Sequence, residues 1–330
     1  MRGLSFFIEE IDTSELFATE QPYAFSLLLK RLGLWDETWP FNSFQGTGLL
    51  SPVLVQKVFN KREKILLVDG FKRIEWARAT QISTVSCLVI PEDIPLADVC
   101  ALVLAAQKPW INTPALKALF LRFLLNLEVP RETILNRFMP LLGLGPAESL
   151  LRKYLKISAM PETVLLFCHE KRFSMKRCLN LAHHKKGLLE TFFSRTRGLH
   201  LSASLAEELL DNINDILKRE GMSPEQFFET IDVRRVLDQN TDARVKASSF
   251  RELIRRLKFP VLTEIEKDMN QIHKRLLAGR RFNVNWDRAL ENRQLHINTA
   301  IKDTDEFRSV LYELQKEETL KGIEALLSYL

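Results

Sequence analysis

The stretch that decides the fold reads SFQGTGLLSPVLVQKV at residues 43–58, KILLVDGFKRIEWARA at residues 64–79 and ISTVSCLVI at residues 82–90. Short aliphatic and β-branched runs of this kind are typical of buried strands. Asp69-Gly70 ends the second run and indicates a turn, and apolar residues follow at helical spacing. We therefore expect a strand, a second strand, a glycine turn that opens a short helix, and a third strand.

The Gly70 turn has the features of a phosphate-binding site. The unsatisfied N–H groups at a helix start attract anions, and a glycine lets a ligand approach the backbone closely. Lys72 and Arg73 add positive charge beside it. An ordinary strand–helix turn with two solvated cations has the same features, so the residues alone leave both interpretations open.

The same region resembles the N-terminal domain of the ParB/Spo0J chromosome-partition proteins, a fold also used by sulfiredoxin and by free serine kinases. Ser43-Phe44 and residues 48–55 are similar to the family's SI…GLLQPIVV segment. Residues 68–77 are similar to its GERRxxA phosphate-binding turn. Gln107-Lys108 and Asn112 resemble the end of its ENLQR…NP segment. Residues 156–161 lie where the family has LLxLP after its DNA-recognition helix, so the resemblance covers about residues 1–200.

The resemblance implies a nucleotide site for CTP or ATP, formed by Gly48, Leu49, Ser51, Pro52, Asp69, Gly70, Phe71, Lys72, Arg73, Gln107, Lys108 and Asn112. The family's glutamate and asparagine, which help to hold the metal and the triphosphate of CTP, correspond to Leu104 and Ala105 here. This departure argues against CTP hydrolysis, and we name no catalytic residue and no metal ligand. Nucleotide binding without hydrolysis and a vestigial pocket both stay open.

Positive charge is concentrated in the middle of the chain. The net charge of +5 divides into −2 for residues 1–114, +9 for residues 115–200 and −2 for residues 201–330. The middle segment carries 15 Lys and Arg residues against 6 Asp and Glu residues. Phosphate contacts dominate the affinity of proteins for nucleic acids, so a localised basic segment indicates a DNA-binding surface.

The basic segment is expected to be helical. We predict helices over residues 114–127, from Pro130 at the first helical position to Leu142, and from Pro146 to Ile157. The glycines between the last two suggest a helix-turn-helix, although Pro140 interrupts its first helix. The candidate DNA contacts are Arg152, Lys153, Lys156, Arg172, Lys176 and Arg177. A helical bundle with a solvated cationic face is the alternative.

The four cysteines are expected to be reduced core residues. Cys87 and Cys100 lie among aliphatic residues, and no two cysteines form a CxxC pair. Cys168-His169, Cys178 and His183-His184 form the one cluster that suggests a metal, but their spacing matches no usual zinc pattern. After residue 200 we expect amphipathic helices and a small hairpin, Phe282–Trp286 with Leu295–Thr299.

The sequence therefore predicts a helix-rich α+β protein with three parts. Residues 1–112 form a ParB/sulfiredoxin-like mixed-sheet domain, residues 113–200 a helix-turn-helix DNA-binding domain, and residues 201–330 a mainly helical module for partner binding or dimerisation. We expect a cytoplasmic, nucleoid-associated homodimer that binds double-stranded DNA in partition or a related regulatory role. A partner ATPase is expected, and membrane association is not. An enzyme on the same fold (a small-molecule kinase or nucleotide hydrolase) and a protein-interaction adaptor are the alternatives.

Overall fold

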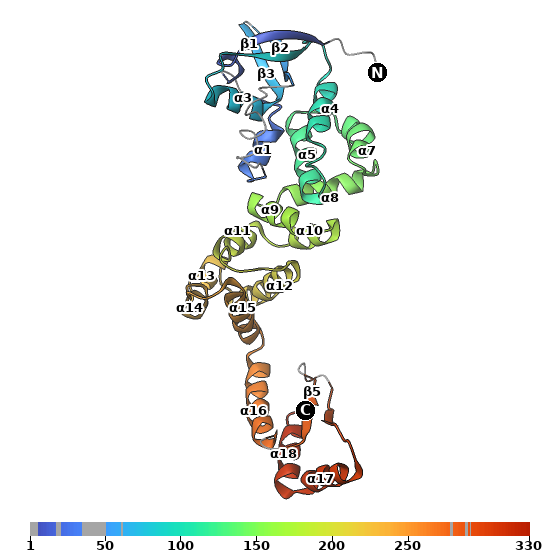
Figure 1. Ribbon diagram of the computed structural model, residues 1–330, viewed down its shortest axis with the longest axis vertical. Coiled ribbons are helices and arrows are strands. Elements are labelled where there is room, and N and C mark those ends of the chain that lie inside the picture. The colour runs from blue at the N-terminus through green and yellow to red at the C-terminus, as the bar shows by residue number, and fades with distance from the viewer. Residues whose placement is uncertain are drawn as a thin grey trace. The chain divides into compact units, whose positions relative to one another are not determined.

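The computed structural model describes residues 6–17, 21–34, 51–60, 62–277, 280–287, 290 and 292–330 (Figure 1). The chain divides into two compact units, one made of Met1–Arg197 with Ser202–Glu207 and the other of Gly198–Leu201 with Glu208–Leu330. The finer division at residue 112 stays a prediction. Two residues of the predicted nucleotide site, Gly48 and Leu49, lie outside the described residues.

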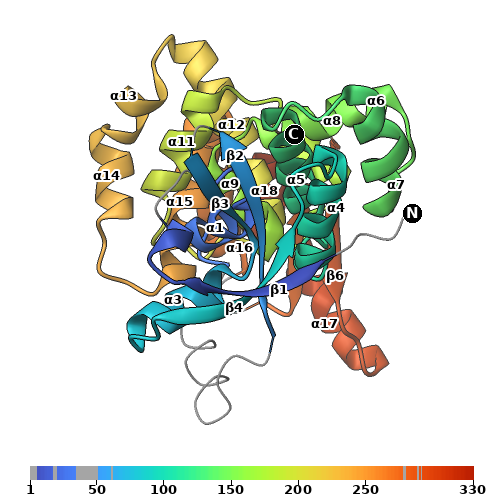
Figure 2. The same ribbon diagram turned by 90° about the horizontal axis from the view of Figure 1, so that it is seen from above.

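The first unit begins with a mixed four-stranded sheet. Its strands are β1 (Phe7–Asp12), β2 (Val53–Asn60), β3 (Arg62–Asp69) and β4 (Thr84–Ile90), in the order β1-β4-β2-β3. β4 is antiparallel to β1, which lies beside it in Figure 2, and parallel to β2, while β2 and β3 are antiparallel. The α-helix α3 (Phe71–Ala79) connects β3 to β4. The succession of elements predicted from residues 43–90 is thus confirmed for its described part.

Alternate strand residues form the core of this sheet. Val53 and Val55 of β2 are fully buried, as is Leu67 of β3, together with Phe71 and Ile74 of α3. Because side chains alternate between the two faces of a strand, this period of two places one apolar face under α3. Burial of a side chain of this size contributes about 1.5–3 kcal/mol. The core therefore fixes where β3 ends and where α3 begins.

The cysteines predicted to be core residues are buried and unpaired by disulfides. Burial raises the pKa of Cys87 and of Cys100 to about 12, so both thiols stay protonated at neutral pH. The hydrogen bond with Cys178 raises the pKa of Cys168, and burial adds to the shift. Among the described residues, no three His, Cys, Asp or Glu side chains are grouped so that they could hold a metal ion.

Aromatic packing joins the N-terminal part to the helices that follow. The turn η1 (Glu15–Phe17) and the helices α1 (Phe25–Arg31) and α4 (Leu96–Gln107) precede α5 (Pro114–Asn126). The Phe25 ring lies 5.1 Å from the ring of Phe120 and 5.3 Å from that of Phe123, both on α5. Helix α4 was not predicted, because its run of apolar residues gives little amphipathic contrast.

The middle segment is helical, as predicted, with shifted boundaries. After α6 (Arg131–Thr133) come a π-helical turn, Ile134–Phe138, and α7 (Met139–Leu141). The remaining helices are α8 (Glu148–Ser158), α9 (Glu162–Glu170), α10 (Met175–Leu181) and α11 (Lys186–Arg195).

The prolines account for the corrected boundaries in this segment. Pro130 is the N-cap of α6 and not its first helical residue, and α8 begins two residues after Pro146 because Ala147 is extended. Pro140 lies inside α7 without ending it. Proline removes a backbone donor and crowds the preceding turn, and the wider π-helical turn directly before α7 relieves that conflict.

The second unit is mainly helical. It contains most of α12 (Ala203–Glu220) and then α13 (Pro224–Phe228), α14 (Ile231–Leu237), α15 (Ala243–Lys258), α16 (Pro260–Leu277), β5 (Phe282–Trp286), β6 (Leu295–Thr299), α17 (Thr304–Gln315) and α18 (Glu317–Leu327). The predicted hairpin is confirmed, since β5 and β6 pair antiparallel with the expected bounds.

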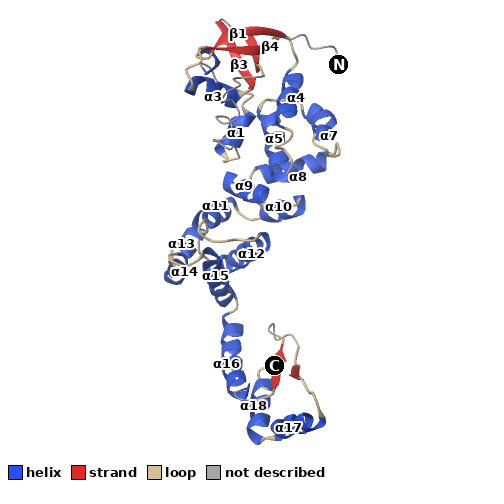
Figure 3. Cartoon of the chain, viewed as in Figure 1, coloured by secondary structure: helices blue, strands red, loops and turns tan. Residues whose placement is uncertain are grey.

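The second unit has a small core of its own around this hairpin. Met269 and Leu276 of α16 and Leu326 of α18 pack with Phe282 and Val284 of β5. Figure 3 shows how small the share of strand is beside the helices, so the helix-rich α+β fold class is confirmed. None of the helices in the described part of the chain combines the length and apolar character that crossing a bilayer requires.

Candidate functional site

Gly70 occupies a backbone conformation that favours glycine. Its φ of 110° and ψ of 18° lie in the left-handed region, and it forms the N-cap of α3. A Cβ atom at this position would lie 3.0 Å from Val53 Cγ1 and 3.2 Å from Arg73 Nε. Glycine is therefore required both for the turn and for the close approach of β2 and of the Arg73 side chain.

The guanidinium group of Arg73 points into the protein, toward Asp69 and the segment that precedes β2. It donates hydrogen bonds to Asp69 Oδ2 at 2.7 Å, to the Ser51 carbonyl oxygen at 3.1 Å and to the Pro52 carbonyl oxygen. Its side chain is 16% exposed. Gln107 of α4 donates to the other carboxylate oxygen of Asp69 at 3.1 Å. Five predicted site residues thus meet in one polar network that joins the start of β2, the Gly70 turn and α4.

The other predicted residues of the nucleotide site differ in their surroundings. Phe71 is buried in the sheet core at 1% exposure. The Lys72 ammonium lies 5.7 Å from the centre of the Trp110 ring, within reach of a cation–π contact. Lys108 is exposed, and Asn112 Nδ2 donates to the Pro109 carbonyl oxygen at 3.3 Å. Trp110 and Lys108 are exposed, whereas Lys72 is half-buried beside the Trp110 ring.

The two glutamates of β1 have partners within the fold. Glu9 accepts a hydrogen bond from Lys57 Nζ at 2.7 Å, and Glu10 accepts one from Ser86 Oγ. The resemblance places Leu104 of α4 at the position of the family's glutamate, and this side chain is only 2% exposed. Asp69 directly precedes Gly70, and Arg73 and Gln107 each donate to one of its two carboxylate oxygens.

The candidate DNA-contacting residues of α8 share one exposed face. Arg152, Lys153 and Lys156 recur at intervals of three and four residues, which places them on one side of a helix. All three are exposed, while Leu151 and Tyr154 are buried on the opposite side. Lys153 and Lys156 have no ion-pair partner among the described residues. These two ammonium groups are therefore available to an anionic ligand.

Glu148 partly neutralises the start of α8. Its carboxylate accepts hydrogen bonds from Arg131 of α6 and lies 3.6 Å from Arg152 Nε. The hydrogen bond from Arg131 lowers the pKa of Glu148, and the same bond raises the pKa of Arg131. Glu148 therefore stays charged and holds Arg131 and the exposed end of Arg152 at the helix start.

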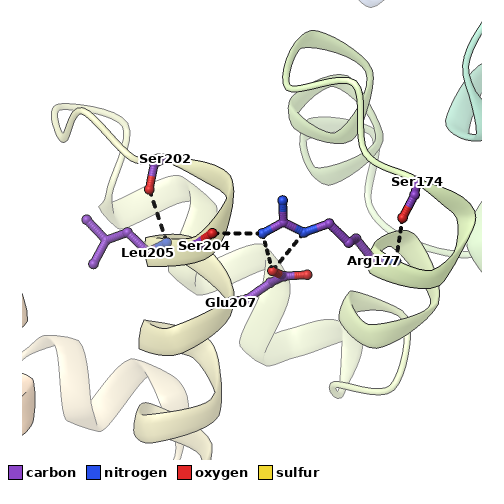
Figure 4. A network of polar contacts seen from close by, with 6 residues as sticks. All are labelled: Ser174, Arg177, Ser202, Ser204, Leu205 and Glu207. Atoms are coloured by element: carbon purple, nitrogen blue, oxygen red, sulfur yellow. Dashed lines mark hydrogen bonds and ion pairs between the residues drawn. The ribbon is translucent and has the colours of Figure 1, made fainter.

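Three of the predicted DNA contacts lie after α9 or on α10, and they differ in whether another side chain of the protein binds them. Arg172 and Lys176 are exposed, and neither has an ion-pair partner within the described residues. Arg172 adopts a φ of 49° at the end of α9, where glycine is the usual residue. Arg177, the last predicted DNA contact, is instead held within the protein (Figure 4).

Arg177 connects α10 to the N-terminal part of α12. Its Nε and Nη2 atoms donate to Glu207 Oε2 at 3.0 and 2.6 Å, and Nη2 also donates to Ser204 Oγ at 3.1 Å. Its guanidinium lies 4.9 Å from the centre of the Phe173 ring. Sequence reasoning missed Glu207, because it lies 30 residues further along the chain and only the fold brings it to Arg177.

No family model and no curated protein matches the sequence. Among solved structures, a pNOB8-like ParB N-domain is 11% identical, with a TM-score of 0.36 over 78% of this chain and 99% of that chain. The C-terminally truncated ParB from Caulobacter crescentus, complexed with the centromeric parS site, is 16% identical, with a TM-score of 0.33 over 62% of this chain and 98% of that chain. A structure of that protein with CTP-γ-S has a TM-score of 0.23.

Proposed function

We propose that this protein is a ParB-like DNA-binding protein that acts in chromosome or plasmid partition or in related regulation. Residues 113–200 are the DNA-binding domain, in which α6, α7 and α8 act as the helix-turn-helix and α8 contacts the duplex. The observation that carries the proposal is the exposed face of α8, where Lys153 and Lys156 have no ion-pair partner among the described residues.

The charge of the whole middle segment supports the same assignment. The segment from residue 115 to residue 200 carries a net charge of +9, whereas the rest of the chain is slightly acidic. Arg172 and Lys176 add exposed cations that have no acidic partner in the described structure. Because released counterions drive binding to DNA, several such cations give affinity for phosphate without any base contact.

The proposal has further parts that rest on the resemblance. A nucleotide, CTP or ATP, binds at the surface of the Gly70 turn, where Lys72 and Lys108 provide positive charge beside Trp110. Arg73 and Asp69 hold the turn in shape for that ligand. The protein acts as a homodimer through residues 201–330, together with a partner ATPase, at the nucleoid.

A salt series of DNA titrations tests the main proposal. Wild type should bind double-stranded DNA of mixed sequence at low salt, and the affinity should fall steeply as salt rises. The variant Arg152→Glu/Lys153→Glu/Lys156→Glu should lose this binding. Lys218→Glu/Lys274→Glu/Lys302→Glu is the matched control, because it changes the net charge equally at exposed positions of other helices and loops. Loss of binding in both variants, or no binding by folded wild type, would contradict the proposal.

A nucleotide titration tests the second part. Lys72→Gln should weaken the binding of CTP or ATP, because it removes the ammonium group beside Trp110 without touching the Arg73 network. Lys64→Gln, an exposed position on β3, is the control and should bind like wild type. Equal affinities in all three proteins would show that the turn holds no nucleotide.

A further inference from the structure

A pocket of about 700 Å³ lies in the first unit, away from the Gly70 network. Its walls are α5, the connection from α8 to α9, and α11, which are labelled in Figure 1. Pockets that bind small molecules span roughly 300–1,000 Å³. The volume of this pocket lies within that range.

One wall of the pocket is a row of polar side chains on α11. Lys186, Glu190 and Ser194 follow one another at intervals of four residues, so they share one face of the helix. Lys186 Nζ lies 3.5 Å from Glu190 Oε1, and its side chain is 69% exposed. This ion pair is long and solvated, so it holds the Lys186 ammonium group only weakly.

Arg122 of α5 supplies a second cation from another wall. Its Nη1 donates to the Ser158 carbonyl oxygen at 2.8 Å, which fixes the guanidinium at the end of α8. The remaining guanidinium N–H groups have no partner among the described residues. A guanidinium held in this way presents a planar set of donors to a phosphate or carboxylate group.

Neutral donors complete the polar part of the lining. The hydroxyl groups of Thr163 and Ser194 have no hydrogen-bond partner in the described structure. Pro161 is the N-cap of α9 and offers no side-chain cap, which leaves the first backbone N–H groups of that helix open. The second carboxylate of the lining, Glu162, is paired with Arg31 at 2.8 Å.

The rest of the lining is apolar. Leu155, Met160 and Pro161 form a hydrophobic surface beside the donors, and Met160 is only 6% exposed. We propose that this pocket binds a small phosphorylated metabolite of nucleotide size. Arg122, Lys186 and Ser194 hold the phosphate group, while the apolar body lies against Met160 and Pro161.

This assignment is independent of the DNA-binding face and of the Gly70 turn. None of the residues proposed to contact DNA or nucleotide lines the pocket. A phosphate group can reach the pocket from two sources, a free metabolite or the DNA backbone. Probes of both kinds are therefore needed in the same experiment.

The experiment titrates the full-length protein by calorimetry with inorganic phosphate, with each of the four 5′-nucleoside monophosphates, and with duplex DNA. We expect at least one monophosphate to bind more tightly than inorganic phosphate. Lys186→Gln should weaken that binding by about tenfold or more, since it removes a charged partner of the phosphate. Ser194→Ala should weaken it less. Both positions are exposed, so neither change threatens the fold.

Lys185→Gln is the matched control, because Lys185 is the exposed neighbour of Lys186 and does not line the pocket. Equal weakening by Lys185→Gln and Lys186→Gln would overturn the proposal, as would the absence of monophosphate binding by folded wild type. Binding that survives Lys186→Gln but is lost in Lys72→Gln would place the ligand at the Gly70 turn instead. If Lys186→Gln loses DNA binding but keeps monophosphate binding, the pocket holds a phosphate of DNA, and the proposal of a metabolite site is overturned.

Discussion

The Gly70 turn and the exposed face of α8 use the same residue types in opposite ways. In the turn, Arg73 is 16% exposed and donates to Asp69 and to two backbone carbonyl groups. On α8, Lys153 and Lys156 are exposed, and no acidic side chain of the described chain pairs with them. A cation that is bound within the fold stabilises it, whereas an unpaired cation is available to a partner.

The largest change in stability is expected for Arg73→Ala. This substitution leaves one oxygen of Asp69 and the carbonyl groups of Ser51 and Pro52 without their donor. We expect the free energy of unfolding to fall by about 2–3 kcal/mol, because the lost hydrogen bonds involve a charged group that is largely buried. Chemical denaturation measures the change. Lys153→Ala is the control and should unfold like wild type, so equal destabilisation of both variants would contradict the comparison.

Gly70→Ala should have a somewhat smaller effect. The new Cβ atom would meet Val53 Cγ1 at 3.0 Å in a left-handed backbone conformation. We expect a loss of about 1–2 kcal/mol in the free energy of unfolding. Gly145→Ala is the matched control, since open space surrounds that position and its φ is not left-handed. A Gly70→Ala protein as stable as Gly145→Ala would show that the turn tolerates a side chain.

The difference between these two regions explains what the sequence could predict. The alternation of Val53, Val55 and Leu67 and the Asp69-Gly70 turn are local signals, and they were sufficient for the order of strands and helix. The partners of Arg73 are not local: Pro52 lies 21 residues before it, and Gln107 lies 38 residues after Asp69. The pair of Arg177 with Glu207 is likewise made by the fold. Which cations are free is therefore a property of tertiary structure, and it could not be read from charge alone.

Glu148→Gln tests whether the cations that an acidic side chain holds at the start of α8 can be released to bind DNA. The carboxylate holds Arg131 and Arg152 and lies in the first turn of the proposed DNA-contacting helix. Its removal frees both cations and takes one negative charge away from the phosphates, so we expect DNA affinity to rise by about two- to fivefold at low salt. The gain should shrink as salt is added, because screening weakens surface charges. Glu132→Gln is the control on α6, and a gain of the same size there would mean that only net charge matters.

The smallest expected effect concerns His169, whose ring is drawn into the protein, unlike the free cations of the same segment. His169 Nδ1 lies 3.0 Å from Thr113 Oγ1, and burial lowers the pKa of the imidazole, with Arg172 adding to the shift. The unfolded chain therefore binds a proton more readily than the folded one. Stability should be fully present above pH 6.5, the ordinary value, and should decline as the pH falls from there toward the lowered pKa. Thermal melting at pH 7.5 and pH 5.5 measures the decline, and His169→Gln should reduce it. A decline of unchanged size in that variant would mean that other groups cause it.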